Sequence, residues 1–311
     1  MGMNPELIRA ASRRITSGRP SPFLPTSRIV DTPRILRSLG FASAPRLVVR
    51  ALEQALGVTA FERLCARAGV PARNTDVRQQ IRDLFAAADI RWEVAERARP
   101  GNRFPSGPLV FYGNHPYGFA DALIALSIAL YRRPDTKVIA NSMLAAFDFP
   151  AAQTLWVDVD SGARRMPTNR RSLRSALRHL QSGGALLIFP SRVCSHLRLP
   201  ECRVTDPPWS PHLLSLIDRT KATCVPLYFH RCNSWRFQSL GLIHPMLRTL
   251  LLLREFVDLR GRCIRVNVGA PVRWDGSGGE RAERMRELRE RVYGLHAASC
   301  PLARGSSASL D

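Results

Sequence analysis

The stretch Leu109-Val-Phe-Tyr-Gly-Asn-His-Pro-Tyr-Gly-Phe-Ala-Asp121 decides the fold class of this chain. Its first four residues favour a β-strand, and residues 122–131 behind it favour an apolar helix. His115 and Asp121 stand six positions apart, and residues at that spacing do not share a face of an uninterrupted helix. Gly118 supplies the backbone freedom for a turn between them. A histidine base and an orienting carboxylate that meet across such a turn form the core of many acyl-transfer sites.

A structural reading of this stretch stays open from spacing alone. Asp121 is also a suitable N-cap for the helix over residues 122–131, and His115 would then be an ordinary loop residue. Motifs elsewhere in the chain are therefore needed to distinguish a site from a cap.

The composition bounds the class of protein. A chain of 311 residues fits one large domain with extensions. The formal net charge of +21 predicts attraction to anionic partners: a lipid surface, nucleic acid or an acidic carrier protein. A basic nucleic-acid-binding protein is the less favoured alternative, because aromatic residues are only 7% and no nucleic-acid-reading motif is present.

Cysteine usage and hydropathy indicate the compartment. The seven cysteines are scattered and show no C-x-x-C pair, which favours reduced thiols in a cytoplasmic setting over a disulfide framework or a zinc site. No stretch reaches the roughly 18 consecutive apolar residues of a membrane-spanning helix. We therefore expect a protein that lies on the cytoplasmic side of a membrane as a peripheral protein.

The chain divides into three regions. Residues 1–99 are expected to form a basic arm followed by a helical, membrane-apposed region. Within it, Thr59-Ala-Phe-Glu62 predicts a capping box that opens a helix ending near Gly69. Residues 276–311 are expected to form a linker, a C-terminal amphipathic helix and a frayed tail.

Residues 100–275 alternate between strand and helix patterns, which predicts a single α/β domain with a mostly buried mixed sheet flanked by helices. A helix over residues 169–181 presents an arginine-rich face, for which a solvated surface and a lipid-binding or carrier-binding surface both remain open. The expected strands cover residues 109–112, 137–140, 154–157, 185–189, 224–229 and 263–268.

Four segments occur in an order that resembles the glycerolipid and lysophospholipid acyltransferase family. They are Asn114-His-Pro-Tyr-Gly-Phe-Ala-Asp121, Lys137-Val-Ile-Ala-Asn-Ser-Met-Leu144, Leu187-Ile-Phe-Pro-Ser191 and Val225-Pro-Leu-Tyr-Phe-His230. The chain is most similar to the bacterial hemolysin-type and ornithine-lipid-type branch, because five residues separate His115 from Asp121 (an HX5D motif) where four are usual. The likeness extends through Asp206-Pro-Pro-Trp209 and the segment beginning at His244, and covers about residues 105–273.

The resemblance implies an O-acyltransferase that moves a fatty acyl group from acyl carrier protein or coenzyme A to a lyso-lipid hydroxyl. His115 would be the general base and Asp121 would fix its tautomer. An unperturbed imidazole titrates near neutrality, which suits it to take a proton from a poorly nucleophilic hydroxyl. No metal or redox cofactor is expected, and the expected partners are the thioester donor, the lyso-lipid and an anionic membrane surface, without nucleic acid.

The resemblance also implies a set of substrate-binding positions. In the third segment Arg192 and Val193 stand where the family has a glycine and an acidic or hydroxyl residue, so either Arg192 takes over a head-group contact or the loop has lost a residue. Pro226 is expected to shape a strand edge or a loop near the site. The implied substrate-binding residues are Asn114, Gly118, Asn141, Phe189, Pro190, Ser191, Arg192 and Pro226.

The acceptor and two alternative functions stay open. Asp158 and Asp160 stand where phosphate-acceptor relatives often carry an arginine, which favours a lyso-aminolipid or another non-phosphatidate acceptor over lysophosphatidate. A catalytically inactive acyltransferase-like scaffold is one alternative, because the third segment is altered. A hydrolase that uses Ser191 is disfavoured, because the serine lacks the Gly-x-Ser-x-Gly context of a nucleophile elbow.

Overall fold

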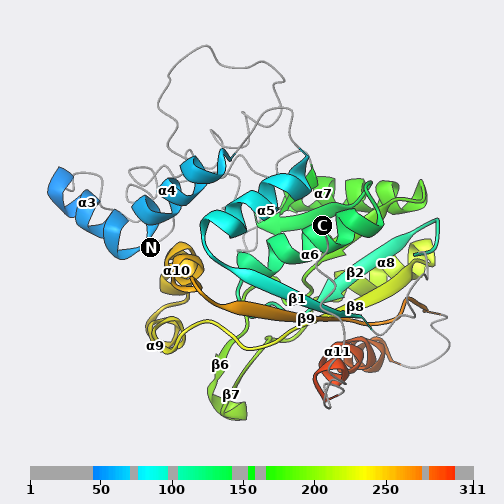
Figure 1. Ribbon diagram of the computed structural model, residues 1–311. Coiled ribbons are helices and arrows are strands. Elements are labelled where there is room, and N and C mark those ends of the chain that lie inside the picture. The colour runs from blue at the N-terminus through cyan, green and yellow to red at the C-terminus, as the bar shows by residue number, and fades with distance from the viewer. Residues whose placement is uncertain are drawn as a thin grey trace.

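A mixed sheet with helices on both faces forms the centre of the molecule (Figure 1). The computed structural model describes residues 45–70, 76–96, 104–141, 153–157, 166–274 and 280–297. The sheet order is β1-β9-β8-β2-β5-β3-β4, and β10 also pairs with β8. Its strands are β1 (Arg91–Glu96), β2 (Leu109–Gly113), β3 (Lys137–Asn141), β4 (Thr154–Val157), β5 (Ala185–Ile188), β8 (Thr223–Phe229), β9 (Cys263–Val268) and β10 (Val272–Arg273).

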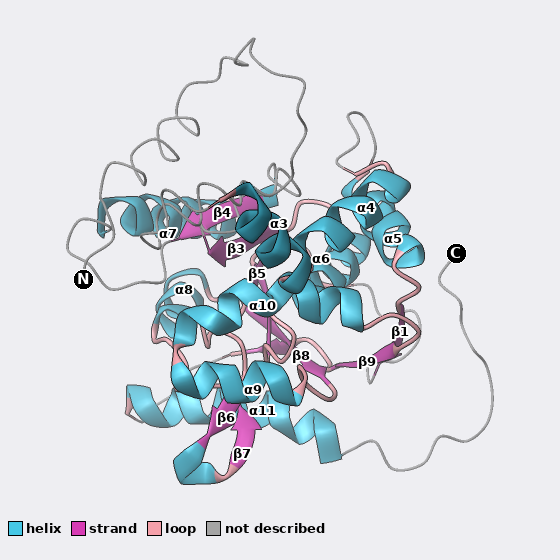
Figure 2. Ribbon diagram, turned by 90° about the vertical axis from the view of Figure 1, so that its left-hand side faces the viewer, coloured by secondary structure: helices cyan, strands magenta, loops and turns pink. Residues whose placement is uncertain are grey.

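Most strand pairs are parallel. β2 lies between β5 and β8 and is parallel to both, while β8 pairs with β9 and β10 in the antiparallel sense. Because these central strands are buried on both faces, they read as nearly continuous apolar runs in the sequence. A separate ribbon of β6 (His196–Arg198) and β7 (Arg203–Thr205) projects from the domain (Figure 2).

Nine helices of the described ranges surround the sheet. They are α3 (Arg46–Ala55), α4 (Val58–Ala68), α5 (Val77–Ala87), α6 (Ala120–Arg132), α7 (Met166–Gln181), α8 (His212–Thr220), α9 (Trp235–Ile243), α10 (Pro245–Asp258) and α11 (Arg281–Ala297). Figure 1 shows α5 and α6 on one side of the sheet and α11 on the opposite side.

The pleat of the strands divides the apolar core into two clusters. Leu109 and Phe111 of β2 pack with α4, α5, α6 and α10 on one face, where Phe256 of α10 is almost fully buried. Val110 and Tyr112 point to the other face and pack with α7, α8 and α11. The loop that follows β2 leaves the sheet on the side of α6 and α10.

The six predicted strands are confirmed, as is the α/β class with a mixed sheet. β1 was not predicted, and it lies in the region assigned to N-terminal helices. It pairs along its whole length with β9, and Phe61 of α4 and Phe85 of α5 belong to the same core cluster as β2. The structure therefore gives residues 45–96 no core of their own.

The predicted capping box at Thr59 is wrong. The N-cap of α4 is Gly57, and Thr59 already lies inside the helix, which begins at Val58. Gly57 has a φ of +74°, and a Cβ there would lie 2.7 Å from the Cα of Arg254. Close packing of α4 on α10 sets the start of this helix, because only glycine allows both the turn and the approach.

The C-terminal amphipathic helix is confirmed as α11, with Leu288, Val292 and Leu295 buried against the sheet. Several predicted features lie outside the described residues: the basic arm over residues 1 to about 40, the linker at 276–279, the frayed tail, Asp158 and Asp160. In the part of the chain that is described, no helix has both the length and the apolar character needed to cross a bilayer.

Candidate active site

The loop between β2 and α6 brings His115 and Asp121 together. Nδ1 of His115 lies 3.2 Å from Oδ1 of Asp121, and the carboxylate is fully buried while 14% of the imidazole is exposed. Oδ2 of Asp121 accepts a hydrogen bond of 2.8 Å from the backbone N–H of Tyr117. The simple N-cap reading of Asp121 is wrong, because Phe119 is the N-cap and Asp121 lies within the first turn of α6. A carboxylate there also lies favourably in the field of the helix dipole.

Gly118 makes this turn possible. Its φ of +78° lies in the left-handed region, where a side chain is strained. A Cβ at this position would collide with Sγ of Cys194 and would lie 2.7 Å from Cδ2 of Leu252 on α10. Glycine is therefore needed both for the conformation of the loop and for its close packing.

The neighbouring strand β5 contributes the second segment of the site. Tyr112 of β2 lies opposite Ile188 of β5, so the residues after both strands emerge at the same edge of the sheet. The ring of Phe189 stacks on the imidazole of His115 with centroids 4.1 Å apart. In open α/β sheets, ligands bind outside the carboxyl ends of the strands, which is where these segments lie.

A second buried carboxylate, Asp206, fixes the backbone of the histidine. Its Oδ1 accepts hydrogen bonds from the backbone N–H of His115 (3.2 Å) and from the hydroxyl of Ser195, and its Oδ2 accepts one from Nε1 of Trp209 (2.9 Å). Burial raises the pKa of Asp206, against the lowering effect of these hydrogen bonds. Sequence reasoning noted the Asp206-Pro-Pro-Trp209 segment but assigned it no role. The three-residue spacing of Asp206 and Trp209 was the available signal.

These carboxylates set the ionisation of His115. Burial by itself lowers the pKa of the imidazole, but the charge and hydrogen bond of Asp121 and the charge of Asp206 outweigh it and raise the pKa above the usual 6.5. Since Nδ1 faces Asp121, Nε2 is the nitrogen left to receive a proton from a substrate. The arrangement can therefore act as a general base.

Asn114 and Asn141 lie at the ends of two strands. The side-chain amide of Asn114 donates to the backbone carbonyl of Phe229 (2.9 Å), and its oxygen accepts from the N–H of the same residue (2.7 Å). Asn114 thus joins the carboxyl ends of β2 and β8. Asn141 is the last residue of β3, half-buried and two strands away from β2.

The third segment continues from Phe189 into a tight loop. Pro190 and Ser191 are buried, and the hydroxyl of Ser191 donates to the carbonyl of Val193 (2.9 Å). Arg192 is exposed and has a φ of +65°. That left-handed conformation is one that glycine favours, so Arg192 adopts an uncommon backbone conformation at the surface of this loop.

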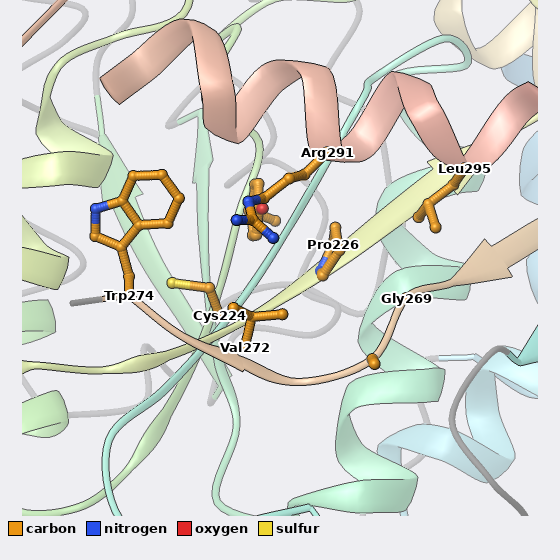
Figure 3. Close-up of a pocket in the computed structure, with 9 residues that line it drawn as sticks. Cys224, Pro226, Gly269, Val272, Trp274, Arg291 and Leu295 are labelled. Carbon is orange, nitrogen blue, oxygen red and sulfur yellow. The ribbon is translucent and has the colours of Figure 1, made fainter. Parts of the chain in front are cut away.

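Pro226 was expected to shape a strand edge or a loop near the site. This expectation is wrong, because Pro226 lies within β8 at the centre of the sheet. Its carbonyl accepts a bond from Gly269, so the missing N–H faces the bend between β9 and β10. Pro226 and Leu295 line a cavity of about 220 Å³. Figure 3 shows Pro226 below α11, which carries Leu295. Tyr112 and Trp274 also line it, and both belong to the core cluster on the face away from α6. Pro226 and His115 therefore lie on different faces.

Three nucleophilic side chains near His115 do not form a catalytic pair with it. Ser191 and Ser195 donate their hydroxyl protons to Val193 and Asp206, and neither is hydrogen-bonded to the imidazole. Burial, reinforced by Asp121 and Asp206, raises the pKa of the Cys194 thiol well above its usual value. A thiol in that state is a weak nucleophile.

Comparison with known proteins identifies a sequence family. A family model described as "Acyltransferase" matches residues 75–299, which is more than half of the chain. No curated protein matches the chain. Among solved structures, the crystal structure of the 1-acyl-sn-glycerophosphate (LPA) acyltransferase PlsC from Thermotoga maritima is similar at 13% sequence identity and a TM-score of 0.40, over 82% of this chain and 94% of that one.

Proposed function

The chain belongs to the acyltransferase family, and from this membership we propose that it transfers a fatty acyl group from a thioester donor to the hydroxyl of a lyso-lipid. The donor is acyl carrier protein or coenzyme A carrying the acyl chain. The five-residue spacing between His115 and Asp121 supports a place in the bacterial hemolysin-type and ornithine-lipid-type branch. The observation that carries the proposal is the contact between Nδ1 of His115 and the buried carboxylate of Asp121.

In this proposal His115 acts as a general base. Asp121 holds the imidazole with its proton on Nδ1, so that the lone pair of Nε2 faces the acceptor hydroxyl. Nε2 takes the hydroxyl proton as the oxygen attacks the carbonyl carbon of the thioester. The buried carboxylate stabilises the imidazolium that forms, and general-base catalysis of this kind typically contributes roughly 10²- to 10⁴-fold to the rate.

Collapse of the tetrahedral intermediate completes the transfer. The carbon–sulfur bond breaks, the sulfur leaves with the bonding electrons, and the imidazolium returns its proton to the thiolate. A thiol has a pKa of about 8.5, so its anion leaves more readily than an amine and needs less protonation. The histidine ends neutral, and the products are an ester and a free thiol.

We assign the substrate contacts to the edge of the sheet around His115. Gly118 allows the loop to turn and pack closely, and Phe189 in the Phe189-Pro190-Ser191 turn forms the wall on which the imidazole stacks. Arg192 is exposed beside this wall and is assigned to a polar head group. Asn114 and Asn141 shape the neighbouring strand ends, whereas Pro226 supports the sheet from its other face.

An outward apolar face on α9 supports a peripheral location at an anionic membrane. Trp235, Leu242 and Ile243 have 70%, 48% and 74% of their surfaces exposed, and their spacing places them on one side of the helix. Tryptophan beside aliphatic residues is typical of helices that lie in a membrane interface. Leu199 is also exposed and follows β6, which lies beside α9 (Figure 2). Free cysteines throughout the described ranges support the reducing cytoplasmic side.

Acyl transfer by the His115→Ala variant tests the proposal. The variant should lose at least 100-fold in rate with a labelled acyl thioester and lyso-lipid acceptors, because no other base replaces Nε2. Its thermal unfolding and vesicle binding should match the wild type. His212→Ala, which removes an exposed histidine at the start of α8, should retain full activity. Undiminished transfer by His115→Ala would refute the mechanism, and no transfer by the wild type would favour an inactive scaffold.

A further inference from the structure

Arg248 on α10 is a half-buried arginine without an acidic partner among the described residues. No carboxylate in the described ranges forms an ion pair with its guanidinium, and no hydrogen bond from it is made there. Arg236 and Arg254, which lie on the same pair of helices, both pair with Asp258. Taking a charge out of water without a counter-ion is costly, and burial accordingly lowers the pKa of Arg248.

The packing of α9 on α10 forms a channel for this side chain. A Cβ at Gly241 of α9 would collide with Cδ of Arg248 and would lie 3.0 Å from its Nε. The absence of a side chain at Gly241 therefore leaves room for the arginine stem between the two helices. A surface arginine needs no such channel, because it can extend into solvent.

α10 directs Arg248 towards the catalytic loop. Leu252 lies one turn further along α10, on the same face, and packs where a side chain at Gly118 would be. Cys194, which also packs on Gly118, lies close enough to Arg248 for the guanidinium to lower the pKa of its thiol. The positive charge thus stands beside the loop that carries His115.

The chemistry of an unpaired arginine defines what it can bind. A guanidinium is planar and presents its N–H donors in a fork that matches phosphate oxygens, and it stays protonated at any pH at which the protein is folded. An anionic substrate group that enters the site would provide the missing counter-ion.

We propose that Arg248 binds a phosphate group of a substrate whose reacting atoms are at His115. This inference rests on the proposed acyl transfer, and it adds that a substrate phosphate is bound at the α10 side of the loop. The phosphate comes either from the acceptor head group or from the donor, because coenzyme A and the phosphopantetheine arm of acyl carrier protein both carry one. A phosphate on the acceptor would revise the expectation of a non-phosphatidate lyso-lipid drawn from Asp158 and Asp160.

Kinetics with matched substrates test the inference in the full-length chain. If the acceptor carries the phosphate, Arg248→Ala should raise the KM for lysophosphatidate roughly tenfold or more relative to its effect on uncharged monoacylglycerol, with little change in kcat. If the donor carries it, the KM for acyl coenzyme A should rise instead, with either acceptor. Arg248→Lys should recover part of the affinity, because it retains the charge but not the fork. Arg260→Ala removes an exposed positive charge beyond the end of α10 and should change neither KM.

A comparison of two acyl donors shows which substrate carries the phosphate. If the defect of Arg248→Ala appears with acyl coenzyme A and disappears with a phosphate-free acyl thioester, the phosphate belongs to the donor. If the defect follows the acceptor, it belongs to the head group. An equal loss with all substrates, or no loss with any, would overturn the inference while leaving acyl transfer by the wild type intact.

Equilibrium binding separates this inference from the proposed reaction. Titration of wild type, Arg248→Ala and Arg260→Ala with lysophosphatidate and with coenzyme A requires no turnover. The inference is supported if Arg248→Ala binds one of the two ligands more weakly than the wild type does and Arg260→Ala does not. This holds even if no acyl transfer is observed. Unchanged binding of both ligands contradicts it.

Discussion

The proposed role of His115 as general base predicts how activity depends on pH. Burial lowers the pKa of the imidazole, but Asp121 and Asp206 raise it further, so the net pKa in the folded protein lies above 6.5. A general base works only in its neutral form. Activity should therefore be full above this pKa and should be lost as the pH falls through it.

Replacing Asp121 with asparagine should shift the pH at which activity is lost on the acidic side of the pH–rate profile, its acidic limb. The change removes the strongest charge that raises the pKa of His115, so the limb of kcat/KM should shift to lower pH. The plateau should also fall, by about 100-fold or more, because the imidazolium loses its carboxylate. Rate profiles of the wild type, Asp121→Asn and Asp218→Asn check this, since Asp218 lies on α8 and pairs with Arg284. If the acidic limbs of the wild type and Asp121→Asn coincide, His115 is not the base that titrates.

Gly118 offers a second test at the residue scale. Gly118→Ala should destabilise the fold by more than about 2 kcal/mol, because it adds a steric collision to the strain of a left-handed residue. Gly69→Ala is the matched control: its φ is +65°, but no atom lies within 4 Å of the added Cβ. It should cost only about 1 kcal/mol. Urea denaturation measures both values, and equal losses would exclude the collision.

At the scale of elements, the strands differ in how much of their position is encoded locally. β2, β5 and β8 are central, and their apolar runs are recognisable because both faces are buried. β1 is an edge strand that carries Arg91, Glu93 and Glu96, so it lacks such a run. Its position follows from its pairing with β9, which lies far away in the sequence.

The outward face of α9 leads to a prediction about membrane binding. Trp235→Ala and Ile243→Ser should each weaken binding to vesicles with anionic lipids about tenfold, because each removes apolar surface that would insert into the interface. Tyr131→Ser removes an exposed aromatic residue at the other end of α6 from the catalytic loop and should have little effect. Vesicle sedimentation measures the three affinities. Equal binding by all three variants would exclude α9 as the contact.

At the scale of the whole molecule, the net charge of +21 should dominate the approach to a membrane. Each basic residue near an anionic surface contributes about 1 kcal/mol, and salt screens this attraction beyond about 10 Å at 0.1 M. Binding to anionic vesicles should weaken steeply between low and high salt, whereas the small affinity for zwitterionic vesicles should change little. Sedimentation across a salt series checks this. Salt-independent binding would show that charge is not the cause, and tight salt-dependent DNA binding without acyl transfer would favour the nucleic-acid alternative.

The sequence by itself determined the α/β class, six strands and the turn that joins His115 to Asp121, because apolar periodicity and a glycine-containing turn are properties of neighbouring residues. Only the tertiary structure decided that Asp206 holds the backbone of His115 across 91 positions of sequence. It also decided that Arg248 stands beside the same loop with no counter-ion in the part of the chain that is described. It also moved Pro226 to the other face of the sheet and the start of α4 to Gly57. Each of these features depends on how elements that are distant in the sequence pack together. Such packing arises only in the assembled core, so it cannot be predicted from the pattern of neighbouring residues.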